Sequence, residues 1–187
     1  MFVYDALARE RRAIVIFGAG FVGEYIGKRC MAAGISVTAY CDNVLGRTGD
    51  DVFGLPVRTL PALMEEYGEN IVFLVSVRDI DTVVQQLAAA GDFPWYPVCD
   101  LYELSGIPQT LPFMDRQKLE AAWYVHDHYC DAERLTLNTL DFVITERCSL
   151  RCRECSNLMQ YYEKPQNFGL PALQEQIARL LTVYDEV

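Results

Sequence analysis

AIVIFGAGFVG, residues 13–23, is the stretch from which the fold of this chain can be predicted. Its first five residues are apolar and include three β-branched side chains, which is typical of a buried strand. The spacing Gly-x-Gly-x-x-Gly then leads into a segment in which Val22, Ile26 and Cys30 recur at the spacing of a helix face. The stretch therefore predicts a strand, a tight turn and a helix in direct succession.

Each glycine of this turn has a separate task in a dinucleotide-binding domain. Gly18 permits the tight turn, Gly20 lets a phosphate approach the backbone, and Gly23 allows the helix to pack closely on the strand. The start of the helix then offers free N–H groups and a positive dipole to an anion. The next predicted strand, Ser36 to Cys41, ends at Asp42, where a carboxylate can bind a ribose hydroxyl. These residues predict a pocket for NAD(P) or a nucleotide sugar.

Strand and helix signals go on alternating as far as about residue 98. Residues 70–77 predict a buried strand, a helical pattern follows it, and residues 95–98 predict a short final strand. Elements at this pitch predict an α/β fold, a Rossmann-like parallel sheet with helices on both faces. A proline-punctuated stretch ends this predicted domain, 1–112, and a connector helix is predicted over 113–134.

Between Asp42 and Val57 the glycines and a proline predict a loop, and a helix is predicted from about Leu60 to Tyr67. This arrangement resembles the small nucleotide-binding domains attached to sugar acetyltransferases, glycosyltransferases and methyltransferases. The resemblance implies a nucleotide-linked small molecule as ligand or substrate, although in some members no ligand is evident. The residues leave an inert scaffold open, and hydride transfer lacks support because no substrate domain with an acid or base can be assigned.

The composition describes a globular protein with ample core material. Hydrophobic residues make up 51% and charged residues 22% of the 187 residues, with a formal net charge of -10 and a pI near 4.6. This balance disfavours nucleic acid and anionic membranes as partners, because they are bound by clustered Lys and Arg. No long apolar run and no export signal is evident, which predicts a cytoplasmic location and no membrane partner.

Seven cysteines, an odd number, in a chain without an evident export signal predict reduced thiols rather than a disulfide framework. Cys30, Cys41 and Cys99 lie in apolar surroundings, where cysteine behaves as a small hydrophobe. His126 and His128 stand two positions apart on a predicted helix and do not share a face. We interpret both histidines as packing residues rather than as catalytic or metal-binding groups.

Cys148, Cys152 and Cys155 follow an apolar run with the spacing Cys-x3-Cys-x2-Cys. Three thiolates can bind three irons of a [4Fe-4S] cluster and leave the fourth iron open to a small molecule. The alternatives are a zinc site, which usually needs four ligands, and cysteines without any metal.

TERCSLRCRECSN, residues 145–157, resembles the cluster-binding loop of radical S-adenosylmethionine enzymes. The resemblance implies a [4Fe-4S] cluster that cleaves S-adenosylmethionine to a deoxyadenosyl radical, which abstracts hydrogen from an unknown substrate. It also implies that 135–187 is the truncated start of a (β/α) barrel, its first βα unit, with a helix from Leu170. We therefore expect an inactive fragment, with a homodimer covering this segment. The alternative is a non-catalytic nucleotide or nucleotide-sugar binding module whose cysteines bind zinc or are structural.

Overall fold

The computed structural model describes residues 3–48, 51–131, 144–150, 152–153 and 161–182. The chain divides into two compact units, Met1–Ala132 and Glu133–Val187, which are described separately below.

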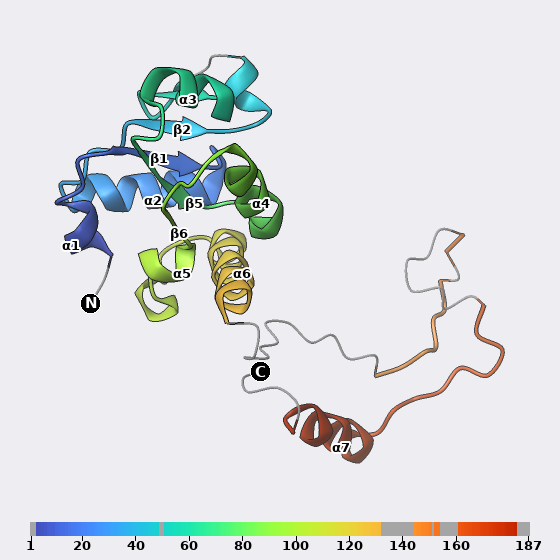
Figure 1. The fold of residues 1–187 in the computed structure, drawn as a ribbon. Helices are drawn as coiled ribbons and strands as arrows, with labels where there is room; N and C mark the ends of the chain where they lie inside the picture. The colour runs from blue at the N-terminus through green and yellow to red at the C-terminus, as the bar shows by residue number, and fades with distance from the viewer. Residues whose placement is uncertain (1–2, 49–50, 132–143, 151, 154–160, 183–187) are drawn as a thin grey trace. The chain divides into compact units, whose positions relative to one another are not determined.

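The first unit is built on a six-stranded sheet in the order β3-β4-β2-β1-β5-β6 (Figure 1). Its strands are β1 (Ala13–Phe17), β2 (Ala39–Cys41), β3 (Asp51–Val52), β4 (Leu55–Arg58), β5 (Ile71–Val75) and β6 (Trp95–Tyr96). All neighbouring strands run parallel except β3, which pairs antiparallel with β4. The sheet is therefore parallel with one antiparallel edge.

Strand β1 lies at the point where the order of the sheet reverses. It pairs with β2 on one side, where Val15 lies opposite Ala39, and with β5 on the other, where Val15 lies opposite Phe73. The chain thus leaves β1 toward one edge of the sheet and later returns to build the other edge. In open parallel sheets, ligands bind at the carboxyl ends of the strands at such a reversal.

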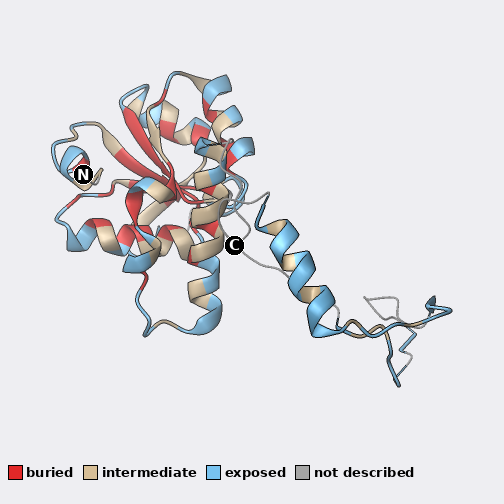
Figure 2. Cartoon of the chain, turned by 90° about the horizontal axis from the view of Figure 1, so that it is seen from below, coloured by how far each residue is buried: buried red, intermediate tan, exposed pale blue. Residues whose placement is uncertain are grey.

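Helices cover both faces of this sheet, and the strands form a buried layer between them (Figure 2). One face carries α1 (Tyr4–Leu7), α2 (Phe21–Ala32), α5 (Val98–Leu101) and α6 (Phe113–Cys130), and the other carries α3 (Leu60–Tyr67) and α4 (Ile80–Ala90). Short 3-10 turns occur at η1 (Leu45–Arg47) and η2 (Leu104–Gly106).

Alternation along the strands explains the two faces. In β1, Ile14 and Ile16 pack toward α2 and α6, whereas Val15 and Phe17 pack toward α3 and α4. Apolar side chains on both faces are what a parallel sheet buried on both sides requires. The predicted Rossmann-like α/β fold is confirmed.

The hairpin formed by β3 and β4 replaces the loop that the sequence predicts between Asp42 and Val57. Phe53 and Gly54, at its tip, have positive φ angles of 53° and 72°, as in the two-residue turns that join antiparallel strands. The strands are short, and Pro56 lies within β4, opposite Asp51. Proline is uncommon within a strand, so the sequence does not predict this hairpin.

The helix that the sequence predicts as a connector belongs to the first unit. It is α6, and Leu119 and Ala122 are buried in the same core as α2 and β1. The packing of α6 places residues at the carboxyl ends of the strands that were not predicted to lie there.

In the second unit, α7 (Leu170–Leu180) lies where the sequence predicts a helix. Pro171 at its start fits, because the first turn of a helix needs no N–H donor there. The apolar run that predicts a strand before Cys148 falls largely on residues 132–143, outside the described part of the chain. Its described end, Thr145, forms an antiparallel bridge with Asn167.

None of the helices in the described ranges is both long and apolar enough to cross a membrane.

Candidate ligand-binding site

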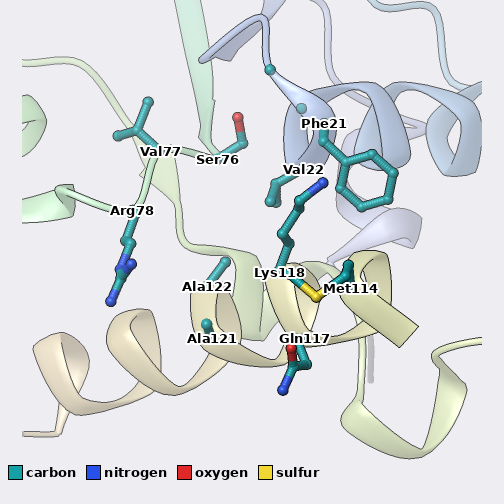
Figure 3. A pocket seen from close by; sticks show the side chains of 12 residues that line it. Phe21, Val22, Ser76, Val77, Arg78, Met114, Gln117, Lys118, Ala121 and Ala122 are labelled. Atoms are coloured by element: carbon teal, nitrogen blue, oxygen red, sulfur yellow. The ribbon is translucent and has the colours of Figure 1, made fainter. Parts of the chain in front are cut away.

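A pocket of about 500 Å³ lies at the carboxyl ends of β1 and β5, between the start of α2 and the first half of α6 (Figure 3). Its size is that of a small-molecule site. The residues that line it are Gly20, Phe21, Val22, Gly23, Ser76, Val77, Arg78, Met114, Gln117, Lys118, Ala121 and Ala122. Two of the predicted nucleotide-site residues, Gly20 and Gly23, are among them.

The three glycines of the turn meet different surroundings. Gly18 has a φ of +108°, and a Cβ there would lie 2.7 Å from the Ser76 hydroxyl oxygen and 2.8 Å from a methyl group of Val77. A Cβ on Gly23 would fall onto the carbonyl oxygen of Gly18. Gly20 differs, because a Cβ there would meet nothing within 4 Å and its φ of -85° suits any residue. Gly18 and Gly23 are thus required by the fold, whereas Gly20 is not.

Ser76 ties the glycine turn to β5. It follows β5 directly, is only 4% exposed, and donates its hydroxyl to the carbonyl groups of Phe17 at 2.8 Å and Gly18 at 3.1 Å. Its backbone N–H also bonds to the Phe17 carbonyl. The end of β1 and the end of β5 are therefore joined through one side chain at the floor of the pocket.

The start of α2 presents backbone donors to the pocket. The first bond of the helical ladder runs from the Glu24 N–H to the Gly20 carbonyl at 2.9 Å. The N–H groups of Phe21, Val22 and Gly23 precede this bond, so the helix itself gives them no partner. Together with the helix dipole, they make this end of the pocket favourable for an anion.

The charged side chains in the lining are Arg78 and Lys118, and it contains no Asp or Glu. Lys118 extends from α6 toward the start of α2 (Figure 3), with its ammonium 5.0 Å from the centre of the Phe21 ring and 2.9 Å from an Asp115 carboxylate oxygen. Its side chain is 53% exposed, so it can move without leaving a packed core. The lining therefore carries two cationic side chains, of which Lys118 is paired with Asp115.

Asp42 ends β2 as the sequence predicts, but its carboxylate bonds to backbone groups. It accepts hydrogen bonds from the N–H groups of Ala19 at 3.2 Å, Val44 at 2.9 Å and Leu45 at 2.9 Å. Asp42 thereby holds the glycine turn against the loop after β2, and it is not among the residues that line the pocket. Its predicted contact with a ribose stays a prediction.

His126 anchors α6 beside the pocket. Its ring is completely buried, accepts a hydrogen bond at Nδ1 from the Val98 N–H at 3.1 Å, and donates from Nε2 to the Val77 carbonyl at 2.7 Å. Burial lowers the pKa of His126 below its ordinary value, and the bond to Val77 opposes this in part. The neutral ring is thus a packing residue that links α6 to the backbone just after β5.

Reasoning from the sequence placed no residue of α6 in the site. Met114, Lys118, Ala122 and His126 recur at intervals of four, so that each is a neighbour of the next on the helix surface. The first three line the pocket and the fourth fixes this side of the helix to the sheet. The spacing was visible in the sequence, but where the helix packs was not.

Comparison with known proteins assigns no family. No protein-family model matches the chain, and no curated protein matches it. A search of solved structures finds the crystal structure of a methyltransferase FkbM from Methylobacillus flagellatus KT, with 18% sequence identity and a TM-score of 0.40. The match covers 73% of this chain and 38% of that one. A similarity this distant transfers no activity.

These findings correct the prediction of a radical S-adenosylmethionine enzyme. No protein-family model, of radical S-adenosylmethionine enzymes or of any other family, matches the chain. Within the described ranges, no three His, Cys, Asp or Glu side chains come together to hold a metal ion. Cys148 and Cys152 are exposed, and Cys155 lies outside the described residues. The assignment of a [4Fe-4S] cluster and of radical chemistry is therefore wrong, since the part of the chain that the structure describes contains no metal-binding group.

Proposed function

We propose that the first unit binds a phosphate-bearing, nucleotide-like small molecule at the carboxyl ends of β1 and β5. One observation carries this proposal. The glycine turn opens at Gly20 onto a pocket whose charged lining side chains are Arg78 and Lys118.

The hydrogen-bond donors of the pocket favour an anionic group in the ligand. The residues at the start of α2, whose first N–H groups have no partner in the helix, line the same pocket as Arg78 and Lys118. A phosphate accepts from backbone N–H groups and from a guanidinium at once, and its charge complements a helix amino terminus. No carboxylate in the lining opposes it.

Gly20 supports the same conclusion independently. Neither its backbone angles nor its surroundings within the folded chain call for glycine. A side chain at this position would occupy the pocket instead, next to the first N–H groups of α2. Glycine here leaves the backbone open to close approach by a phosphate, which is the role predicted for it from the sequence.

The other side chains of the pocket lining favour an apolar part of the ligand. Val22 and Val77 lie on one side, and Met114, Ala121 and Ala122 come from α6. Small and aliphatic side chains of this kind fit a flat ring such as a nucleobase. A nucleoside phosphate, dinucleotide or nucleotide sugar combines both parts.

The lining favours binding over proton transfer. It contains no His, Cys, Asp, Glu or Tyr, its Lys118 is paired with Asp115, and the Ser76 hydroxyl is engaged with two carbonyl groups. General acid or base catalysis needs a titratable group within hydrogen-bond reach of the ligand. We therefore infer a binding module rather than a hydride-transfer site.

Calorimetric titration of the whole chain with ADP, NAD, UDP-glucose and S-adenosylmethionine tests this proposal. We expect at least one phosphate-bearing ligand to bind more tightly than S-adenosylmethionine, because the sulfonium of the latter carries a positive charge toward Arg78 and Lys118. Tighter binding of S-adenosylmethionine would contradict the proposal. Absence of binding by all four ligands at millimolar concentration would leave the inert scaffold as the better explanation.

Gly20→Ala is expected to weaken binding of that ligand by about tenfold or more while leaving the free energy of unfolding within about 1 kcal/mol of the parent. The added methyl group has space in the folded chain but occupies the place of the phosphate. Gly106→Ala is the matched control, because a Cβ there also meets nothing within 4 Å and Gly106 lies in η2, outside the pocket lining. Equal affinity for both variants would place the ligand elsewhere.

Arg78→Gln is expected to weaken binding of a phosphate-bearing ligand by about tenfold and to reduce its dependence on salt, because one charge-assisted contact is lost. Titrations at low and high ionic strength measure both effects. Lys28→Gln serves as the control, since Lys28 lies on α2 but does not line this pocket. A loss of affinity that is the same for both variants would indicate only a general charge effect.

The cytoplasmic location and a homodimer through residues 135–187 stay predictions. Size-exclusion chromatography with light scattering measures the second.

A further inference from the structure

Two thiols that the sequence does not connect lie together beside the core of the first unit. Cys99 belongs to α5 and is half-buried, whereas Cys130 is the last residue of α6 and is exposed. Helices α5 and α6 pack directly against each other. Each thiol affects the pKa of the other, in keeping with side chains that lie near each other across these two helices.

A neighbouring contact fixes this register. The Val98 N–H, one residue before Cys99, donates to Nδ1 of His126 at 3.1 Å. Cys130 follows His126 by four residues and is therefore its neighbour on the surface of α6. The buried histidine thus fixes the backbone next to Cys99 against the helical turn that precedes Cys130.

The other described cysteines lack such an arrangement. Cys30 and Cys41 are completely buried, and burial raises the pKa of the Cys30 thiol to about 11 and that of Cys41 to about 12. Neither is accessible to an oxidant in the folded protein. In the first unit, the accessible thiol is Cys130, and its neighbour is Cys99.

We propose that Cys99 and Cys130 form a reversible disulfide that fastens the end of α6 to α5. The reaction is exchange with a small-molecule disulfide such as oxidised glutathione. The Cys130 thiolate attacks one sulfur of glutathione disulfide and releases one glutathione thiolate. The Cys99 thiolate then attacks the Cys130 sulfur of the mixed disulfide and releases the second. Two protein thiols are oxidised, two glutathione thiols are formed, and the protein loses two hydrogens.

The surroundings set the conditions for this reaction. Burial raises the pKa of both thiols, and the carboxylates of Asp100 and Asp127 raise it further. Little thiolate is present at neutral pH, so exchange is faster in mildly alkaline solution.

Peptide mapping tests the proposal directly. Trypsin places Cys99 in the peptide 79–116 and Cys130 in the peptide 119–134, and neither peptide contains another cysteine. The folded whole chain is incubated with oxidised glutathione at about pH 8.5, where the thiolate fraction is larger than at neutral pH. Free thiols are then blocked and the digest is analysed by mass spectrometry with and without reductant. We expect the two peptides to be linked and to separate on reduction.

Cys99→Ser and Cys130→Ser should each abolish this linked pair, whereas Cys152→Ser, a matched exposed cysteine of the second unit, should leave it unchanged. Digests that contain only links to Cys148, Cys152 or Cys155 would overturn the proposal. So would a stable glutathione adduct on Cys130 with Cys99 still free.

Thermal unfolding gives a second measurement. A bond that closes a loop of about 30 residues without strain should raise the melting temperature of the first unit by about 5 °C, and reductant should reverse the rise. A lower melting temperature of the linked form would show that the thiols are not positioned for the bond, and would overturn the proposal.

Discussion

Gly23→Ala is expected to destabilise the first unit by about 3 kcal/mol, the largest effect among the substitutions considered for the glycine turn. The new Cβ would fall onto the carbonyl oxygen of Gly18 and lie 2.9 Å from the Ser76 hydroxyl oxygen. Neither neighbour can move easily, because the carbonyl is backbone and the Ser76 hydroxyl is bonded to two carbonyl groups. Helix α2 would have to shift away from β1 and give up apolar contact.

Urea unfolding followed by tryptophan fluorescence measures this loss. Both tryptophans, Trp95 and Trp123, lie in the first unit and therefore report on it alone. Gly20→Ala, three residues earlier in the same turn, is the control, because its methyl group enters open space. If Gly23→Ala and Gly20→Ala unfold at the same urea concentration, the close packing of α2 on the turn is not as described.

His126→Ala is expected to cost about 3 kcal/mol of unfolding free energy. The substitution removes a completely buried side chain and leaves the Val98 N–H and the Val77 carbonyl without their hydrogen-bond partner. His126→Asn should cost less, because its amide oxygen can take the place of Nδ1 as an acceptor for Val98. Urea unfolding ranks the two variants, and equal losses would show that the hydrogen bond to Val98 adds nothing to packing.

The same residue makes stability depend on pH. Burial lowers the pKa of His126 in the folded protein, so the unfolded chain, whose histidine has the ordinary pKa of about 6.5, takes up a proton first. The stabilisation is therefore fully present above about pH 6.5 and is lost as the pH falls toward the folded pKa. As the pH falls over this range, the parent protein should lose more unfolding free energy than His126→Asn does. His128→Gln, which removes the only other histidine, should show the same larger loss.

The elements that local sequence determines were predicted well. The strand, turn and helix of residues 13–32 are present, and each glycine has the surroundings expected of its task. These predictions succeed because backbone angles and apolar periodicity act over a few residues. The hairpin of β3 and β4 was missed because Pro56 conceals a strand that is stabilised by its partners.

The site was predicted only in part because its remaining residues are joined by tertiary packing. Lys118 and Met114 reach the pocket only since α6 lies against the sheet, and the spacing of α6 residues does not say where the helix docks. Asp42 was placed correctly at the end of β2, but its carboxylate bonds to the backbone of Ala19 and of the following loop. Several short polar residues form such bonds to nearby backbone, so the sequence did not predict this one. The cluster predicted from the cysteine spacing was wrong because a spacing in the sequence does not by itself show that the side chains meet in the fold.

Ser76 and Asp42 hold the glycine turn from opposite sides, one through carbonyl groups and the other through the Ala19 N–H. A ligand that binds to the glycine turn meets hydrogen-bond donors that are already in place. The protein therefore loses little conformational entropy on binding, and affinity depends on a preorganised backbone. Crystals grown with and without a bound nucleotide should therefore superimpose closely from Phe17 to Gly23. Adaptation to different ligands is left to the side chain of Lys118.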